Sequence, residues 1–144
     1  MRALINVQPA NWFNASDRSA LQAIRREVFV YEQGVSEAEE MDAFDTDSTH
    51  LLATTETQDT VGCARIMPSG QIGRMAVRME RRGQGIGSML LDAAIAEAKR
   101  QNFSRIFLHA QCHAESFYAQ FGFHRVGDIF CEAGIEHIAM IFRE

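Results

Sequence analysis

The sequence predicts an α+β fold in which a mixed, mostly antiparallel β-sheet carries helices on both faces. Three short apolar runs separated by turn residues indicate an antiparallel meander in the middle of the chain. The clearest helical pattern follows this meander, and the apolar run after that helix indicates a strand parallel to the one before it. The length of 144 residues and the 47% hydrophobic content favour a single domain over residues 1–144.

A strand and an amphipathic helix are expected first. Residues 2–8 have the apolar content of a strand, and Pro9 is expected to end it because proline lacks the N–H that a ladder needs. Ser16 or Asp17 can cap the helix that follows, and Gly34 is expected to stop it. The apolar stripe of this helix, spaced by three and four residues, comprises Leu21, Ile24, Val28 and Tyr31.

The rest of the chain alternates loops, strands and two further helices. Residues 36–47 are acidic and rich in turn residues, so we expect an exposed loop with one short helical stretch, close to the ligand. The strongest helix is expected over residues 85–101, and a strand buried on both faces over residues 105–110. The other expected elements are strands over residues 50–55, 61–67, 71–77, 123–127 and 135–142 and a short helix over residues 114–121.

Composition excludes several classes of protein. Three widely spaced cysteines without a C-x-x-C pair indicate neither a disulfide framework nor a zinc knuckle. No apolar stretch is long enough for a membrane helix, and the first residues turn polar too soon for a signal peptide, so we expect a cytoplasmic protein with no membrane partner. The net charge of -5 argues against nucleic acid as the partner, because that interaction relies on basic surface.

The charges are unevenly distributed along the chain. None of the 14 basic residues lies between Glu27 and Ala64, whereas ten of the 19 acidic residues lie in the span that begins with Glu27. Two patches of opposite sign would suit an anionic cofactor and a cationic substrate, and the alternative is that both are only solvated faces. The arginines that precede the glycine-rich turn are Arg74, Arg78, Arg81 and Arg82.

The glycine-rich turn, residues 82–87 (Arg-Gly-Gln-Gly-Ile-Gly), lies between a predicted strand and the strongest helix. Glycines leave backbone N–H groups unshielded, and a helix start adds partial positive charge, so the segment suits a phosphate or a pyrophosphate. It is not a P-loop, because no Gly-Lys-Ser/Thr follows, and Met89 and Leu90 stand where a dinucleotide-binding motif has its third glycine. The alternative is that the glycines only make a tight turn.

These residues resemble a known family. Arg82-x-x-Gly85-x-Gly87, after the expected strand, resembles the acetyl-coenzyme A (acetyl-CoA) signature of the GNAT superfamily of N-acetyltransferases. Residues 117–123 (Phe-Tyr-Ala-Gln-Phe-Gly-Phe) resemble the family's F-Y-x-x-x-G-F segment. Residues 28–35, the acidic loop, His50-Leu51 and residues 134–140 are similar to the ElaA-like branch.

The resemblance implies an enzyme that uses acetyl-CoA. In this family the pyrophosphate binds the amides of the glycine-rich loop, and the pantetheine arm pairs with the fourth strand where the strands splay. An N–H group of that strand would also polarise the thioester carbonyl. The cofactor-binding residues implied in this sequence are Met75, Ala76, Val77, Arg82, Gly83, Gln84, Gly85, Ile86, Gly87, Ser88 and Gln111.

Tyr118 matches the family's residue that assists the departing thiolate. A tyrosine of pKa ~10 would protonate a thiolate of pKa ~8.5 at a cost of about 2 kcal/mol, so hydrogen bonding to the sulfur matters more than full transfer. The alternative is a packing tyrosine between Phe117 and Phe121. The general base is not assigned, because this sequence has Arg74 and Met75 where some members of the family have an acidic residue on the fourth strand. Its candidates are Glu27, Glu32, Glu37, His50 and His137.

Several alternatives accompany this interpretation. Cys112 is either an inert thiol or a nucleophile that takes the acetyl group first. His109, Cys112 and His113 lack a fourth metal ligand at a recognisable spacing, so no metal is expected. The chain could instead be a catalytically silent sensor that binds acyl-CoA. The acceptor is expected to be a cationic small amine or a lysine-containing substrate, and a homodimer through the final strand is a further expectation from the family.

Overall fold

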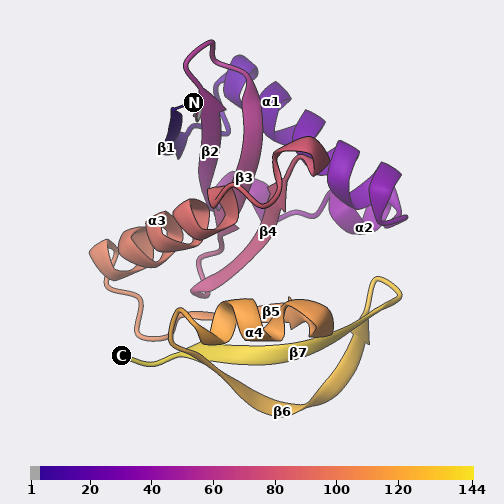
Figure 1. Ribbon diagram of the computed structural model, residues 1–144, viewed down its shortest axis with the longest axis vertical. Helices are drawn as coiled ribbons and strands as arrows, with labels where there is room; N and C mark the ends of the chain where they lie inside the picture. The colour runs from indigo at the N-terminus through magenta and orange to yellow at the C-terminus, as the bar shows by residue number, and fades with distance from the viewer. Residues whose placement is uncertain (1–3) are drawn as a thin grey trace.

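The computed structural model describes residues 4–144 and shows a seven-stranded sheet of order β1-β2-β3-β4-β5-β7-β6 (Figure 1). All neighbours pair antiparallel except β4 and β5, so the predicted mixed α+β fold is confirmed. The strands are β1 (Ile5–Ala10), β2 (Thr49–Thr55), β3 (Thr60–Ile66), β4 (Gln71–Val77), β5 (Phe107–Gln111), β6 (Phe123–Glu132) and β7 (Ile135–Phe142). The helices are α1 (Ala15–Arg25), the π-helix η1 (Arg26–Glu32), α2 (Glu37–Glu40), α3 (Ile86–Arg100) and α4 (Glu115–Ala119), with short 3₁₀ turns η2 (Asp45–Asp47), η3 (Met79–Arg81) and η4 (Cys112–Ala114).

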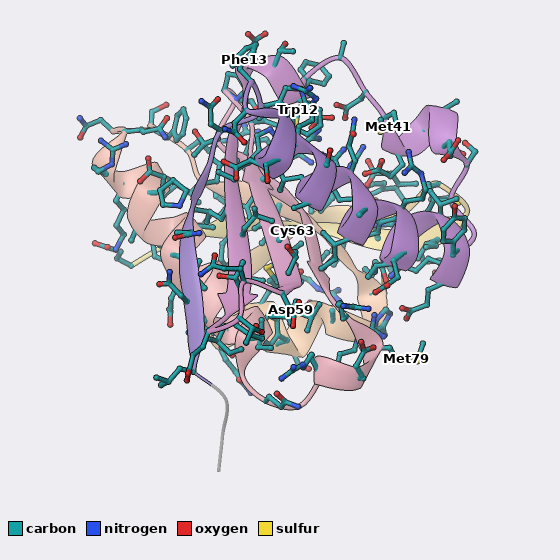
Figure 2. All side chains as sticks on the ribbon, turned by 90° about the horizontal axis from the view of Figure 1, so that it is seen from above. Trp12, Phe13, Met41, Asp59, Cys63 and Met79 are labelled. Carbon is teal, nitrogen blue, oxygen red and sulfur yellow. The ribbon has the colours of Figure 1, made fainter. Side chains whose placement is uncertain are left out.

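Helices cover both faces of the sheet. On one face α3 and α4 bury the larger core, in which Leu90, Leu91 and Ala94 of α3 are fully buried against the strands. On the other face α1 packs Leu21 and Ile24 over the central strands, as Figure 2 shows with Cys63 beneath the helix. None of the helices within residues 4–144 has the length and apolarity required to cross a bilayer.

The first helix differs from the prediction at both ends. Asn14 caps α1, its side chain accepting a hydrogen bond from the N–H of Asp17 at 2.9 Å, so neither Ser16 nor Asp17 is the cap. At the other end α1 continues into the π-helix η1, whose wider turns change which residues share a face. Tyr31 therefore leaves the predicted apolar stripe and is 74% exposed.

The first strand extends beyond its predicted end. Strand β1 continues through Pro9 to Ala10, which is compatible with proline because β1 lies at an edge of the sheet. The predicted start of this strand at residues 2–3 lies outside the described residues. The final strand β7 lies between β5 and β6, so β6 and not β7 is the edge strand. A homodimer that uses the final strand stays a prediction.

The sheet opens between β4 and β5. These strands pair only at Gln71 with Phe107 and at Ile72 with Leu108. Beyond Ile72 they diverge, and Figure 1 shows β5, β6 and β7 as a layer separate from the strands that precede them. Arg74 has a φ of 47° at this point, and the pairing of β3 with β4 shifts register between Cys63 and Arg65. The irregular strand thus leaves an edge of β4 without a strand partner, as the predicted splay requires.

Candidate active site

A cavity of about 1330 Å³ lies where β4 and β5 diverge. It is larger than the ~300–1,000 Å³ of ordinary small-molecule pockets, so it has room for an extended ligand. All the predicted cofactor-binding residues and Tyr118 line it except Gln84, which is exposed outside it. Those residues are Met75, Ala76, Val77, Arg82, Gly83, Gly85, Ile86, Gly87, Ser88, Gln111 and Tyr118.

The glycine-rich turn presents the start of α3 to this cavity. Gly83 and Gly85 have φ values of 80° and 83°, a left-handed conformation that glycine adopts without a steric penalty. Gly85 is the N-terminal cap of α3, and no side chain caps the helix. The N–H groups of the first turn therefore lack intrahelical partners, and they give this end of the helix a partial positive charge. This cradle fits a phosphate or a diphosphate.

The four arginines near the turn do not form one free basic patch. Arg82 donates to both carboxylate oxygens of Glu32, at 2.6 and 2.8 Å. Arg78 forms ion pairs of 3.2 Å with both Glu27 and Glu80, and Arg74 turns instead toward α2. Arg81 lines the cavity and forms no ion pair among the residues that the structure describes. The predicted patch was too large because the sequence does not show these partners.

Tyr118 reaches the cavity from α4 and is held by aromatic packing. Its ring meets Phe117 edge-to-face at 5.1 Å and Phe123 at 6.2 Å between centroids. Burial raises the pKa of Tyr118 to about 12, because the phenolate would lose its solvation. The residue therefore packs against the core and also lines the cavity, with its hydroxyl neutral.

The five predicted candidates for the general base have different surroundings. Glu27, Glu37 and His50 do not line the cavity. Glu32 does, but its hydrogen bonds with Arg82 hold the pKa of its carboxyl below the ordinary value, which makes it a poor proton acceptor. His137 also lines the cavity and is 7% exposed. Geometry thus leaves His137 as the candidate in position.

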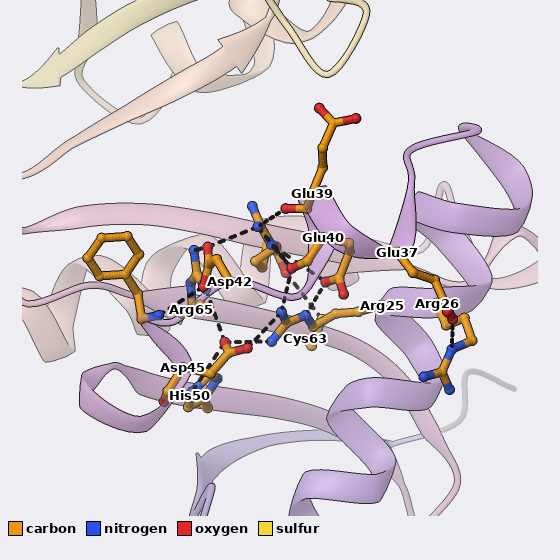
Figure 3. Close-up of polar contacts among 12 residues, drawn as sticks. Arg25, Arg26, Glu37, Glu39, Glu40, Asp42, Asp45, His50, Cys63 and Arg65 are labelled. Atoms are coloured by element: carbon orange, nitrogen blue, oxygen red, sulfur yellow. Dashed lines mark hydrogen bonds and ion pairs between the residues drawn. The ribbon is translucent and has the colours of Figure 1, made fainter.

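Most of the acidic loop, residues 36–47, is exposed and includes the short helix α2, as predicted, but three of its carboxylates turn into the protein: Glu40, Asp42 and Asp45. Figure 3 shows Arg25 and Arg65 pointing into one group of carboxylates. Arg25 donates to Asp45 at 2.8 Å, and Arg65 donates to the same carboxylate at 3.0 Å. Arg65 and Arg74 also bind Asp42, at 2.7 and 3.1 Å. The guanidinium groups come from α1, β3 and β4, so distant parts of the sequence neutralise the inward-facing carboxylates of the loop.

Two features of the site were not predicted from the sequence. The Nε2 of Gln111 donates to the Oε1 of Gln33 at 3.1 Å, which joins the end of β5 to the end of η1. Glu132 also lines the cavity, together with His109. The sequence offered no element there, because the strand expected to end at residue 127 continues as β6 to Glu132. Cys112, in contrast, does not line the cavity.

Comparison with known proteins agrees with this geometry. A family model described as an acetyltransferase (GNAT) domain matches residues 14–143. The chain belongs to the GNAT acetyltransferase family. The GNAT fold binds acyl-CoA in general, and the cavity between β4 and β5 has the cradle and the free strand edge for such a ligand.

Relatives of this GNAT protein confirm the predicted branch. UPF0039 protein sll0451 of Synechocystis sp. is 40% identical over 129 residues, which cover 84% of this chain and 82% of that protein. Protein ElaA of Escherichia coli is 32% identical over 136 residues, 88% of each chain.

Solved structures give the same assignment. The crystal structure of Escherichia coli ElaA has a TM-score of 0.87 and 29% identity, covering 97% of this chain and 100% of that one. The structure of an acyl-CoA N-acyltransferase from Pseudomonas aeruginosa has a TM-score of 0.85 and 28% identity, with coverages of 97% and 100%. The protein is therefore an acyltransferase of the GNAT fold.

Proposed function

We propose that the protein transfers an acetyl group from acetyl-CoA directly to a primary amine. The observation that carries the proposal is the single cavity that extends from the uncapped start of α3, along the free edge of β4, to Tyr118. An acyl-CoA diphosphate fits the amides of residues 83–88, and the amide-bearing arm fits the β4 edge. This arrangement would place the thioester between β4 and Tyr118.

The residues at that position suit acyl transfer to nitrogen. The amine nitrogen attacks the thioester carbonyl carbon, and an N–H group of β4 stabilises the resulting oxyanion. The carbon–sulfur bond then breaks, and the Tyr118 hydroxyl donates a hydrogen bond to the departing thiolate. Direct transfer is favoured over an acetyl-cysteine intermediate, because Cys112 lies outside the cavity wall.

Thiol release in the presence of amines tests this function. Purified protein is incubated with acetyl-CoA and a panel of primary amines that includes spermidine, ethanolamine and Nα-acetyl-lysine amide, and free coenzyme A is measured. We expect release that depends on both the protein and the amine, with an N-acetylated product by mass spectrometry. Parallel reactions with butyryl-CoA and octanoyl-CoA establish the acyl group.

Each failure has a separate meaning. Tight binding of acetyl-CoA without thiol release across the panel would support the silent sensor. A faster reaction with butyryl-CoA or octanoyl-CoA than with acetyl-CoA would show that the transferred group is a longer acyl group and not acetyl. Absence of any affinity for coenzyme A would contradict the proposal as a whole.

A further inference from the structure

A carboxylate lies between two imidazoles on the cavity wall opposite Tyr118. The Nδ1 of His109 is 3.3 Å from the Oε1 of Glu132, and the Nε2 of His137 is 3.7 Å from the Oε2 of the same carboxylate. Phe130 supports both rings, edge-to-face with His109 at 5.1 Å and stacked on His137 at 5.9 Å. The two imidazoles and the carboxylate all line the cavity.

The hydrogen bonds define which nitrogen atoms carry protons. The Nδ1 of His137 is 2.8 Å from the carbonyl oxygen of Ile135, which only accepts, so this nitrogen donates and carries hydrogen. By the same reasoning the Nδ1 of His109 donates to Glu132. In the neutral ring the Nε2 of His137 is then an acceptor that faces a second acceptor, the Oε2 of Glu132.

Two facing acceptors at this distance need a donor between them. The Nε2 of His137 has no hydrogen-bond partner among residues 4–144, and the side chain is only 9% exposed. An alkylammonium group has several N–H donors and a positive charge, so it can donate to Glu132 and to His137 at once. A metal ion is a weaker fit, because no three metal-ligating side chains within the described chain are arranged to hold one.

The cluster lies on the opposite face of the sheet from Tyr118. His137 is paired with Gln111 of β5 and with Phe130 of β6, so these side chains share a face. The alternate residues Ile138 and Met140 point into the core beneath α3 and α4, which contains Tyr118. Gln111 contacts the end of η1, so the cluster faces the side of the sheet that α1 and η1 cover.

Since the proposed acyl-CoA occupies the start of α3 and the β4 edge, the cavity mouth on the α1 face remains for the acceptor. Resting on that proposed function, we infer that Glu132 and His137 form the subsite for a primary ammonium group, and that His137 is the general base. His109 positions Glu132 through its hydrogen bond. This subsite places the attraction for a cationic acceptor on the β6–β7 hairpin and not on the acidic loop, whose inward-facing carboxylates are already paired with arginines.

The proton balance follows from this arrangement. The bound ammonium transfers one proton to the Nε2 of His137, and Glu132 stabilises the imidazolium that forms. The neutral nitrogen attacks the thioester carbon, the carbon–sulfur bond breaks, and the nitrogen loses its second proton. One of these two protons ends on the coenzyme A thiol, and the other passes to solvent.

Imidazole NMR with a simple probe tests the subsite without turnover. Protein labelled with ¹⁵N-histidine is saturated with coenzyme A and titrated with n-butylammonium chloride. We expect saturable shifts of His137 and His109, and none of His124, which is exposed on β6 away from the cavity. Tetramethylammonium chloride, which has the charge but no N–H, should leave all these signals unchanged.

Matched variants complete the test. Glu132→Gln should weaken the butylammonium response about tenfold or more, since it removes a charged hydrogen bond. Glu136→Gln removes the same charge from an exposed neighbour outside the cavity and should leave the response intact. Neither variant should change the affinity for coenzyme A. With the best amine of the panel, His137→Gln should lower kcat and leave the KM for acyl-CoA unchanged.

The outcomes separate this inference from the proposed function. If coenzyme A binds while butylammonium produces no shift, or an equal shift in Glu132→Gln, the ammonium subsite is wrong and the acyltransferase proposal stands. An unchanged kcat in His137→Gln would show that His137 is not the general base. If coenzyme A itself does not bind, the proposed function fails first.

Discussion

Tyr118 illustrates how burial restricts the chemistry of a single residue. Its pKa is raised to about 12, whereas a thiol titrates near ~8.5, so full proton transfer to the thiolate would cost about 5 kcal/mol. This is a larger barrier than an ordinary tyrosine would face. The useful contribution of the hydroxyl is therefore a hydrogen bond to the sulfur as negative charge develops, with the proton supplied from elsewhere.

Replacing this hydroxyl should affect turnover and not binding. We expect Tyr118→Phe to lower kcat about 10–100-fold, because the hydrogen bond forms only as the thiolate departs, and to leave the Kd for acetyl-CoA unchanged. Steady-state kinetics and calorimetric titration measure the two quantities. The matched control is Tyr31→Phe, since Tyr31 is the other tyrosine of the chain and is exposed on η1. Equal kcat in both variants would remove Tyr118 from the mechanism.

Single residues of the site differ in how well the sequence predicts them. The glycines of the α3 turn and Tyr118 belong to short motifs, so their roles can be predicted from a few adjacent residues. The ion pair between Arg82 and Glu32 spans 50 residues, and nothing local to either residue indicates it. Glu132 was missed for the same reason, because its partner His109 lies on a different strand.

At the scale of elements, the acidic segment around α2 depends on three arginines. Burial alone would raise the pKa of Asp45, but its hydrogen bonds and attraction to Arg25 and then Arg65 outweigh that effect and hold it below the ordinary value. The segment also accepts hydrogen bonds at the carbonyl of Glu40 from Arg74, whose backbone has a positive φ. The loop and the irregular part of β4 therefore support each other.

Breaking this cluster should destabilise the fold. We expect Asp45→Asn to lower the free energy of unfolding by about 3 kcal/mol, because it removes the buried carboxylate that Arg25 and Arg65 share and leaves each guanidinium with one carboxylate partner, Glu40 or Asp42. Urea denaturation measures the change. Asp47→Asn is the matched control, since Asp47 is exposed on the same turn and forms no ion pair within residues 4–144. Similar stability of the two variants would contradict a structural role for the cluster.

His50 gives the same region a pH dependence. Burial lowers the pKa of His50 from its ordinary value of 6.5, although its bond to the carbonyl of Asp45 opposes this. Below pH 6.5 the unfolded chain binds a proton at this position that the folded protein does not, so stabilisation present above pH 6.5 is lost as the pH falls. We expect urea midpoints that decrease from pH 7 to pH 5.

Replacement of this histidine tests the origin of the effect. His50→Gln should flatten the decrease between pH 7 and pH 5, whereas His124→Gln, at an exposed position of β6, should retain it. A further loss below pH 3.8 belongs to Asp42 and Asp45, whose pKa values are both lowered, and should persist in both variants. A slope unaffected by His50→Gln would assign the dependence to other groups.

Elements were predicted where a local pattern alone determines them. The strands β4 and β7 and the helix α3 follow directly from apolar spacing and turn residues. The π-helix η1 was not predicted, because its widened turns depend on packing that a regular helical period does not describe. The second half of β6 was missed because its side chains are mostly exposed and give no apolar alternation.

At the scale of the whole molecule, the sheet consists of two parts joined by a short parallel contact. Only two residue pairs join β4 to β5, supported by a bond from the N–H of Phe107 to the carbonyl of Gly70 at 3.2 Å. A Cβ on Gly70 would lie 1.9 Å from the carbonyl oxygen of Arg105, so the chains approach closely there. The parallel pairing was predictable from the helix between the strands, but its length was not, because it depends on the bend at Arg74.

This opening predicts where an acyl-CoA would protect the backbone. Amides of residues 73–77 that face β5 have no strand partner, so we expect them to exchange quickly in the free protein and slowly once acetyl-CoA bridges the edge. Amides of residues 83–88 should gain protection at the diphosphate, while those of the paired strand β2 should not change. Hydrogen–deuterium exchange with mass spectrometry resolves these segments. Protection confined to residues 83–88 would show that the diphosphate is held but that the pantetheine arm does not pair with β4, and the thioester would then require a different position in the cavity.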